Sequence, residues 1–126
     1  LYAMQYAAPG APTLAARVLE LLRAELGLEG AADEPWGFDD GAWSPLMRIY
    51  PRADLPLVLL SLDPRGDARY HYRLGGGLAA LRAEGVLVIG SGSMTHNLGR
   101  VAPPMENDAR APWVRAFLAW MDEHLA

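Results

Sequence analysis

GVLVIGSGSMTHNL, residues 85–98, is the most informative stretch of this 126-residue chain for predicting its fold. It begins with a run of β-forming apolar residues, 86–89, and continues into a loop of glycines, hydroxyls and one histidine, His96. A second run of the same kind, PLVLLSL, lies upstream at 56–62. Continuous apolar runs of this length are typical of strands that are buried on both faces of a parallel sheet.

Amphipathic or apolar helices are predicted around these two runs. PTLAARVLELLRAEL, at about 12–26, has apolar residues three and four apart, and APWVRAFLAWMDEHL, 111–125, repeats that spacing. ARYHYRLGGGLAALRAEG, 68–85, indicates a helix weakened by three consecutive glycines, and SPLMRIYP, 44–51, predicts a short helix closed by Pro51. Strand, helix, strand and helix in succession predict a layered α/β domain, because parallel strands need a crossover helix.

Composition limits the function classes. A length of 126 residues fits one domain, 1–126, and a net charge of −4 gives no electrostatic footprint for nucleic acid. The chain has no cysteine, which excludes disulfides and thiolate metal sites, and its apolar runs are far shorter than the roughly 20 residues that span a bilayer. We therefore expect a cytoplasmic protein without nucleic-acid or membrane partners, while a homo-oligomer is allowed. The start at Leu1 is typical of the interior of a longer polypeptide.

The glycine loop lies where ligands bind in open α/β sheets, just past the carboxyl end of a strand. A dinucleotide fingerprint needs glycine where Thr95 stands, and a phosphate loop needs a lysine, which the chain lacks. A hydrolase elbow reads Gly-x-Ser-x-Gly, whereas this loop offers Gly90-Ser91-Gly92. Two interpretations stay open for His96: an imidazole beside a metal or substrate, or a histidine that only hydrogen-bonds a turn.

The other titratable candidates have simpler interpretations. His71, between two tyrosines, and His124, in the last helical turn, are predicted to be structural. No His-x-x-His pair exists, so histidines of this chain alone do not assemble a three-ligand catalytic metal site. Asp39 and Asp40 lie in FDDGAW, 38–43, where aspartate before glycine is typical of a turn in a loop.

These segments, together with YAAPGAP, 6–12, and DDGAWSPLMRIYP, 39–51, resemble the middle of the DODA-type (4,5-DOPA dioxygenase-like) extradiol ring-opening dioxygenases. That family includes the catalytic subunit of protocatechuate 4,5-dioxygenase. The resemblance covers nearly the whole chain, and GVLVIGSGSMTHNL is its most specific part. It implies an α/β fold of three layers, α/β/α, with a mostly parallel central sheet, of which this chain is an incomplete version. It also implies that O2 opens a catechol ring at a non-haem Fe(II), in a site that zinc can occupy.

The resemblance also implies the site residues. His96 corresponds to an active-site histidine of the family, as a metal ligand or an acid–base group. The loop residues implied to contact the substrate are Ser91, Ser93, Thr95 and Asn97. Asp40 stands where the family has a second active-site histidine. An aspartate there can accept a hydrogen bond from a catechol hydroxyl but changes the charge of the site.

Two hypotheses follow for the function. In the family, further histidines come from Ser-His-Gly and Ala-His motifs before this region and a His-Pro-x-x-Glu-His motif after it, and this chain contains none of these motifs. The first hypothesis is an extradiol dioxygenase whose partners are O2 and a small aromatic diol such as dihydroxyphenylalanine. The second is a truncated, non-catalytic relative that serves as a binding or subunit module.

Overall fold

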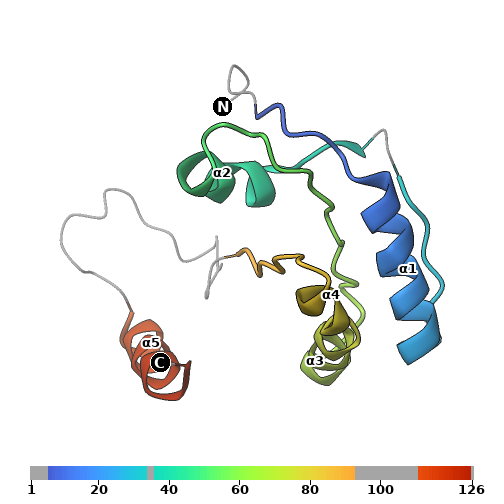
Figure 1. Cartoon of the computed structure of the whole chain (residues 1–126). Coiled ribbons are helices and arrows are strands. Elements are labelled where there is room, and N and C mark those ends of the chain that lie inside the picture. The colour runs from blue at the N-terminus through green and yellow to red at the C-terminus, as the bar shows by residue number, and fades with distance from the viewer. Residues whose placement is uncertain (1–5, 34–35, 93–110, 126) are drawn as a thin grey trace. The chain divides into compact units, whose positions relative to one another are not determined.

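The structure is a computed structural model that describes residues 6–33, 36–92 and 111–125. Its helices are labelled in Figure 1: α1 Pro12–Leu26, α2 Asp40–Ile49, α3 Ala68–Gly77, α4 Ala80–Ala83 and α5 Pro112–Leu125. The chain forms two compact units, Leu1–Ser91 and Gly92–Ala126, and α5 is the helix of the second. The single domain over 1–126 stays a prediction. No helix among the described residues is long and apolar enough to cross a membrane.

Helix α1 has the boundaries that the sequence predicts, 12–26. It ends at Gly27, whose φ of 65° is the left-handed conformation that favours glycine. The Gly27 amide donates to the Arg23 carbonyl at 3.0 Å, and the Leu28 amide donates to the Leu22 carbonyl at 3.2 Å. These bonds satisfy carbonyls that the helix end would otherwise leave unpaired.

The core of the first unit lies between α1, α3 and the α4 turn. Helix α1 packs against α3, and the buried residues of the cluster are Val18, Leu21, Leu22, Leu74, Leu78 and Leu81. At the edge of this core, the Arg17 guanidinium of α1 bonds the Glu84 carboxylate at 2.8 Å. This bond lowers the pKa of Glu84 below its ordinary value.

The helix predicted over 68–85 is divided into α3 and α4. Asp67 caps α3, because its carboxylate accepts from the Tyr70 amide at 2.8 Å. The division follows the glycine run at Gly77, and the Leu78 amide donates to the Gly75 carbonyl, three residues back, at 3.2 Å. Three glycines in a row favour this break, since each costs about 1 kcal/mol relative to alanine in a helix interior.

Helix α2 differs from the prediction of a helix over 44–51. It begins earlier, at Asp40, and ends at Ile49. The cause is Asp39, whose backbone is extended and whose carboxylate accepts from the Ala42 amide at 3.1 Å. Such an N-cap satisfies an amide that has no partner within the helix. The loop predicted over 38–43 is therefore wrong from residue 40 onward.

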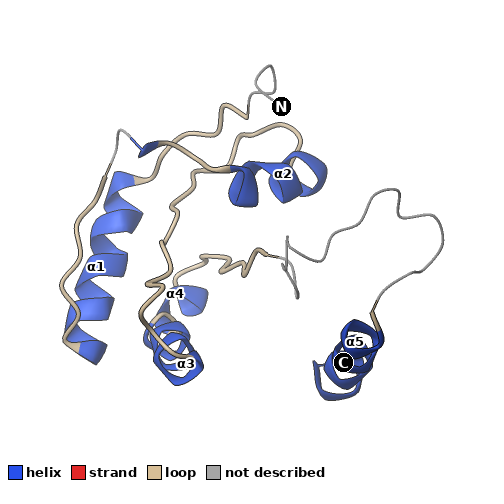
Figure 2. Cartoon of the chain, turned by 180° about the vertical axis from the view of Figure 1, so that it is seen from behind, coloured by secondary structure: helices blue, strands red, loops and turns tan. Residues whose placement is uncertain are grey.

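The strands predicted at 56–62 and 86–92 are not formed among the described residues, which Figure 2 draws as helix and loop. The sheet-like pairing present is one parallel bridge between Gly10 and Leu57. There the Leu57 amide donates to the Pro9 carbonyl at 2.9 Å. Residues 58–62 and 87–91 have no backbone hydrogen bond to another described residue. The predicted parallel sheet is thus not confirmed, because a strand forms only against a partner strand.

Helix α5 is described by itself. It spans Pro112–Leu125, which confirms the predicted helix, and it has no buried residue. The Phe117 and Trp120 rings stack with centroids 6.2 Å apart, and the Trp120 and His124 rings lie 4.6 Å apart. The His124 ring Nδ1 lies 2.8 Å from the Trp120 carbonyl, as donor to it. The structural role predicted for His124 agrees with these contacts.

Candidate active site

The start of α2 places two neighbouring carboxylates in different positions. Asp39 is the N-cap, and its carboxylate is engaged with the Ala42 amide at 3.1 Å. Asp40 is the first residue of the helix, and it is exposed. Its carboxylate lies at the N-terminal end of the helix, where a negative charge interacts favourably with the helix dipole. Of the two, Asp40 is the carboxylate that has no hydrogen-bond partner among the described residues.

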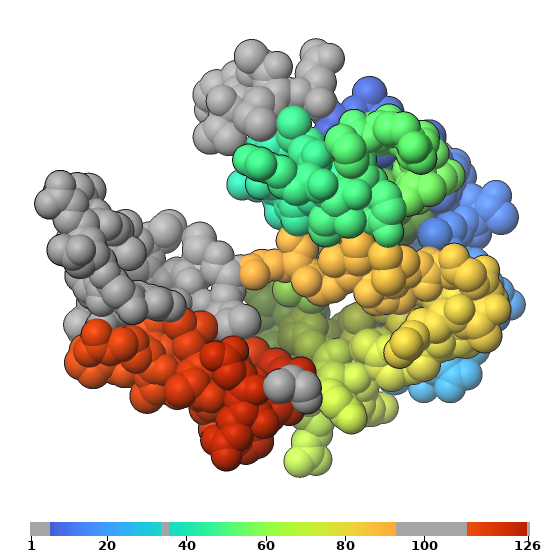
Figure 3. Space-filling model, turned by 60° about the vertical axis from the view of Figure 1, so that its left-hand side comes forward, coloured from blue at the N-terminus to red at the C-terminus, as the bar shows by residue number. Residues whose placement is uncertain are grey.

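Ser91 joins this helix start to the end of the second extended segment. Its hydroxyl donates to the carbonyl oxygen of Gly41, a residue 50 positions earlier in the chain. Figure 3 shows residues 86–92, in orange, directly against the green residues of α2. The structure therefore brings two of the predicted site residues, Ser91 and Asp40, to one place. Sequence analysis did not identify Gly41 as their link.

The other predicted site residues are not placed. Ser93, Thr95, His96 and Asn97 lie outside the described residues. What precedes them is Gly92, with a φ of 158°. The interpretation of His96 therefore continues to rest on the sequence.

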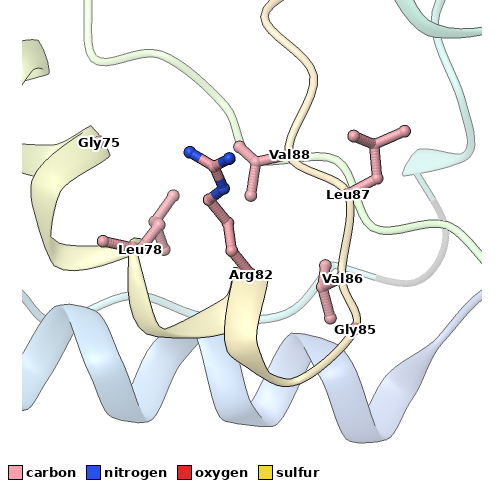
Figure 4. A pocket seen from close by; sticks show the side chains of 8 residues that line it. Gly75, Leu78, Arg82, Gly85, Val86, Leu87 and Val88 are labelled. Atoms are coloured by element: carbon pink, nitrogen blue, oxygen red, sulfur yellow. The ribbon is translucent and has the colours of Figure 1, made fainter.

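A cavity of about 710 Å³ lies elsewhere in the first unit. Its lining residues come from α3, α4 and the segment after them: Gly75, Leu78, Ala79, Arg82, Gly85, Val86, Leu87 and Val88. Figure 4 shows the Arg82 side chain extending between Leu78 and Val88. Neither Asp40 nor Ser91 lines this cavity, so it is distinct from the site at the start of α2.

The remaining histidines of the described chain have structural contacts. His71 Nε2 lies 3.1 Å from the Asp63 carbonyl and donates to it, which leaves the buried Nδ1 without a partner among the described residues. In that same part of the chain, no three His, Asp or Glu side chains are grouped to hold a metal ion. The described residues by themselves therefore do not form a metal site.

The carboxyl groups with shifted pKa values pair with arginines. The Arg65 guanidinium and amide hold the pKa of Asp63 down at about 2, and Arg52 lowers the pKa of Asp54 in the same way. These pairs are exposed, and both join residues two apart in the sequence. Such shifts report local ion pairs and do not identify a catalytic acid or base.

The comparison with known families decides the assignment. Residues 1–125 match the family described as the catalytic LigB subunit of aromatic ring-opening dioxygenase. The chain belongs to this family. The resemblance inferred from GVLVIGSGSMTHNL and its companion segments is thus confirmed.

Individual LigB-family relatives match along nearly all of the chain. It is 46% identical over 125 residues to the 4,5-DOPA dioxygenase extradiol of Beta vulgaris, an alignment covering 99% of this chain and 46% of that protein. For the Escherichia coli K12 protein of the same name, the identity is 40% over 126 residues, covering 99% and 45%. The chain spans about half the length of these relatives.

A solved structure shows that the fold is shared. The crystal structure of an uncharacterized protein from Escherichia coli K12 is 40% identical and superposes with a TM-score of 0.83. The superposition covers 99% of this chain and 50% of that one. The chain is therefore a structural neighbour of a protein twice its length.

Proposed function

We propose that the protein containing this chain is an extradiol ring-cleaving dioxygenase of small aromatic diols. The observation that carries the proposal is the 40–46% identity, across 99% of the chain, to proteins named 4,5-DOPA dioxygenase extradiol. In the reaction, the ring bond beside the hydroxyl pair breaks and both atoms of O2 enter the product. The two carbons of that bond become an aldehyde and a carboxylate, so that O2 is the only oxidant needed.

Two residues of this chain are proposed to act on the substrate. His96 holds or moves a proton, because imidazole exchanges protons near neutral pH. Asp40 accepts a hydrogen bond from a catechol hydroxyl, a role that its exposed carboxylate at the start of α2 supports. The polar residues around His96 are proposed to contact the substrate: Ser91, Ser93, Thr95 and Asn97.

The proposal extends to the metal cofactor, the fold of the whole protein, its location in the cell and its oligomeric state. We infer a non-haem Fe(II) dioxygenase in which zinc can occupy the metal site and His96 is the metal ligand or neighbour that this chain contributes. In the whole protein, residues 56–62 and 86–92 become strands of the parallel central sheet of an α/β/α domain. The parallel direction of the Gly10–Leu57 bridge supports this arrangement. A cytoplasmic location and a homo-oligomer complete the proposal.

The test uses the full-length protein loaded with ferrous iron and supplied with catechols. We expect O2 uptake together with a yellow ring-opened product. His96→Ala should lower kcat by about 100-fold or more, the usual contribution of a general acid or base. His124→Ala is the matched control and should leave kcat unchanged, because His124 contacts its own helix. No turnover of any catechol by iron-loaded protein would overturn the proposal.

Asp40 allows a second, sharper comparison. Asp40→Asn removes the charge and keeps an acceptor oxygen, whereas Asp40→Ala removes both. If the carboxylate accepts from the substrate, Asp40→Ala should raise KM more than Asp40→Asn does. Equal KM values for both variants and the wild type would exclude Asp40 from substrate binding.

The non-catalytic binding or subunit module is the second candidate. Two points favour it: the described residues hold no group of three metal-binding side chains, and the family resemblance implies a histidine where this chain has Asp40. It predicts a purified full-length protein without stoichiometric metal. Bound metal at one ion per chain, together with turnover, would eliminate this candidate.

A further inference from the structure

Gly41 carries a carbonyl that α2 itself does not pair. In an α-helix the carbonyl of residue 41 accepts from the amide of residue 45, four positions later. Residue 45 is Pro45, which lies inside α2 and has no amide hydrogen. The proline ring also presses against the carbonyl four residues before it. The Gly41 carbonyl, in the first turn of the helix, therefore lacks the amide partner that an α-helix normally supplies.

Ser91 meets this acceptor. Its hydroxyl donates to the Gly41 carbonyl, so a side chain 50 residues away takes the place of the missing helical amide. The helix side of the contact is firmly held, because the Ala42 and Trp43 amides both donate to the Asp39 carbonyl at 3.1 Å. The contact therefore fixes residue 91 against a rigid turn that also carries Asp40.

We propose that Ser91 is a positioning residue, which fastens the end of segment 86–91 to the first turn of α2 through the acceptor that Pro45 leaves free. The proposal rests on the proposed function, since it concerns how the end of segment 86–91 is held beside Asp40. It gives Ser91 a role in addition to the proposed substrate contact, because its hydroxyl donates its proton to Gly41 while its oxygen can still accept a hydrogen bond. Pro45 contributes to this positioning indirectly, because it lacks the amide hydrogen that would otherwise pair with the Gly41 carbonyl.

The kinetic test uses the full-length protein and a double-mutant cycle. Ser91→Ala should lower kcat about tenfold, since small misplacements of reacting groups are costly, and should change KM less than twofold. Ser91→Thr keeps a hydroxyl and should restore most of kcat. Ser44→Ala, an exposed serine next to Pro45 in the same helix, is the matched control and should match the wild type.

Pro45→Ala provides the decisive partner variant. It supplies an amide that competes with Ser91 for the Gly41 carbonyl. We therefore expect Ser91→Ala to have little further effect on kcat in the Pro45→Ala background. Independent, multiplying effects of the two substitutions would overturn the proposal, and so would a Ser91→Ala variant that equals Ser44→Ala.

A structural readout separates this proposal from the proposed function. The carbonyl ¹³C chemical shift of Gly41 should move in Ser91→Ala and stay in Ser44→Ala, whether or not the protein turns over catechols. A Gly41 shift that is the same in Ser91→Ala and in the wild type would overturn the contact. If the Gly41 chemical shift changes in Ser91→Ala while the protein turns over no catechol, the contact is supported and only the proposed function is overturned.

Discussion

Leucines are buried in one region of the first unit and exposed in another. In α1, α3 and the α4 turn, the buried leucines are Leu21, Leu22, Leu74, Leu78 and Leu81, the last at 2% exposure. In the extended segments 57–62 and 86–89, Leu59, Leu60, Leu62 and Leu87 are exposed, Leu62 at 71%. A helix pairs its own backbone and needs a neighbour only for its apolar face, whereas a strand needs a neighbour for its backbone as well. Among the described residues of a chain that spans about half the length of its relatives, helices therefore form and strands do not.

The largest expected effect comes from truncating a leucine on each side of this comparison. Leu81→Ala should lower the free energy of unfolding of the 126-residue chain by about 3 kcal/mol, because it leaves a cavity in the core. Leu62→Ala should change it by less than about 0.5 kcal/mol, as for other exposed positions. Urea unfolding followed by circular dichroism measures both. Equal losses would break the comparison, since they would show that 57–62 is buried.

The second prediction concerns the two adjacent aspartates at the start of α2. Asp39→Ala should destabilise the chain by about 1 kcal/mol, because the Ala42 amide loses its acceptor. Asp40→Ala should have a smaller effect on stability, since this side chain is exposed and caps nothing. The urea midpoints of the two variants measure the difference. Reversed sizes would mean that the cap is misassigned.

The third prediction tests the turn between α2 and the first extended segment. Ala53 has a φ of 51°, a left-handed conformation that is unfavourable for alanine. Ala53→Gly should therefore raise the free energy of unfolding by about 0.5 to 1 kcal/mol. Ala32→Gly, at an exposed position outside the helices, is the control and should not stabilise. A loss of stability in Ala53→Gly would show that this turn adopts another conformation.

The smallest effect is a pH dependence from the ion pairs. The pKa of Glu84 lies below its ordinary value of 4.5, and that of Asp63 is lowered from 3.8 to about 2. Carboxyl groups with lowered native pKa values bind fewer protons folded than unfolded, so stability is full above about pH 4.5 and falls as the pH decreases toward 2. Glu84→Gln should reduce the loss of stability at low pH more than Asp63→Asn does.

The reason is that the two pairs differ in sequence separation. Glu84 meets Arg17, 67 residues away, whereas Asp63 meets Arg65, two residues away, and such a local pair partly persists in the unfolded chain. Urea midpoints between pH 6 and pH 2.5 measure the fall. A larger reduction in Asp63→Asn would show that the contact between α1 and residue 84 is not formed.

The helices were predictable because their signals are local. The spacing of apolar residues from Pro12 to Leu26, followed by Gly27, predicted the bounds of α1 correctly. The glycines at 75–77 predicted a weakened helix, and the structure has a break there between α3 and α4. The start of α2 was missed, although its signal was present as Asp39 in a capping position. Asp40 followed by Gly41 is typical of a turn, whereas Asp39 is in a position to cap a helix. The structure has the helix.

The site was predictable only in part. The motif around GSGSMTHN led to the family, and Asp40 and Ser91 were among the residues it implied. The link between them was not predictable from spacing, because a serine hydroxyl and a carbonyl 50 residues apart meet only after folding. Pro45 is the sequence signal that now explains the vacant acceptor.

The sequence by itself determined the LigB family, the amphipathic helices and the residue types at the candidate site, because motifs, periodicity and caps are written within a few neighbouring residues. Tertiary structure alone decided the pairing of Ser91 with Gly41 and the unpaired state of 58–62 among the described residues. Both features depend on whether a hydrogen-bond partner lies next to the backbone group in the folded chain. A helix carries that partner four residues away, whereas a strand or a long-range contact must find it elsewhere in the fold.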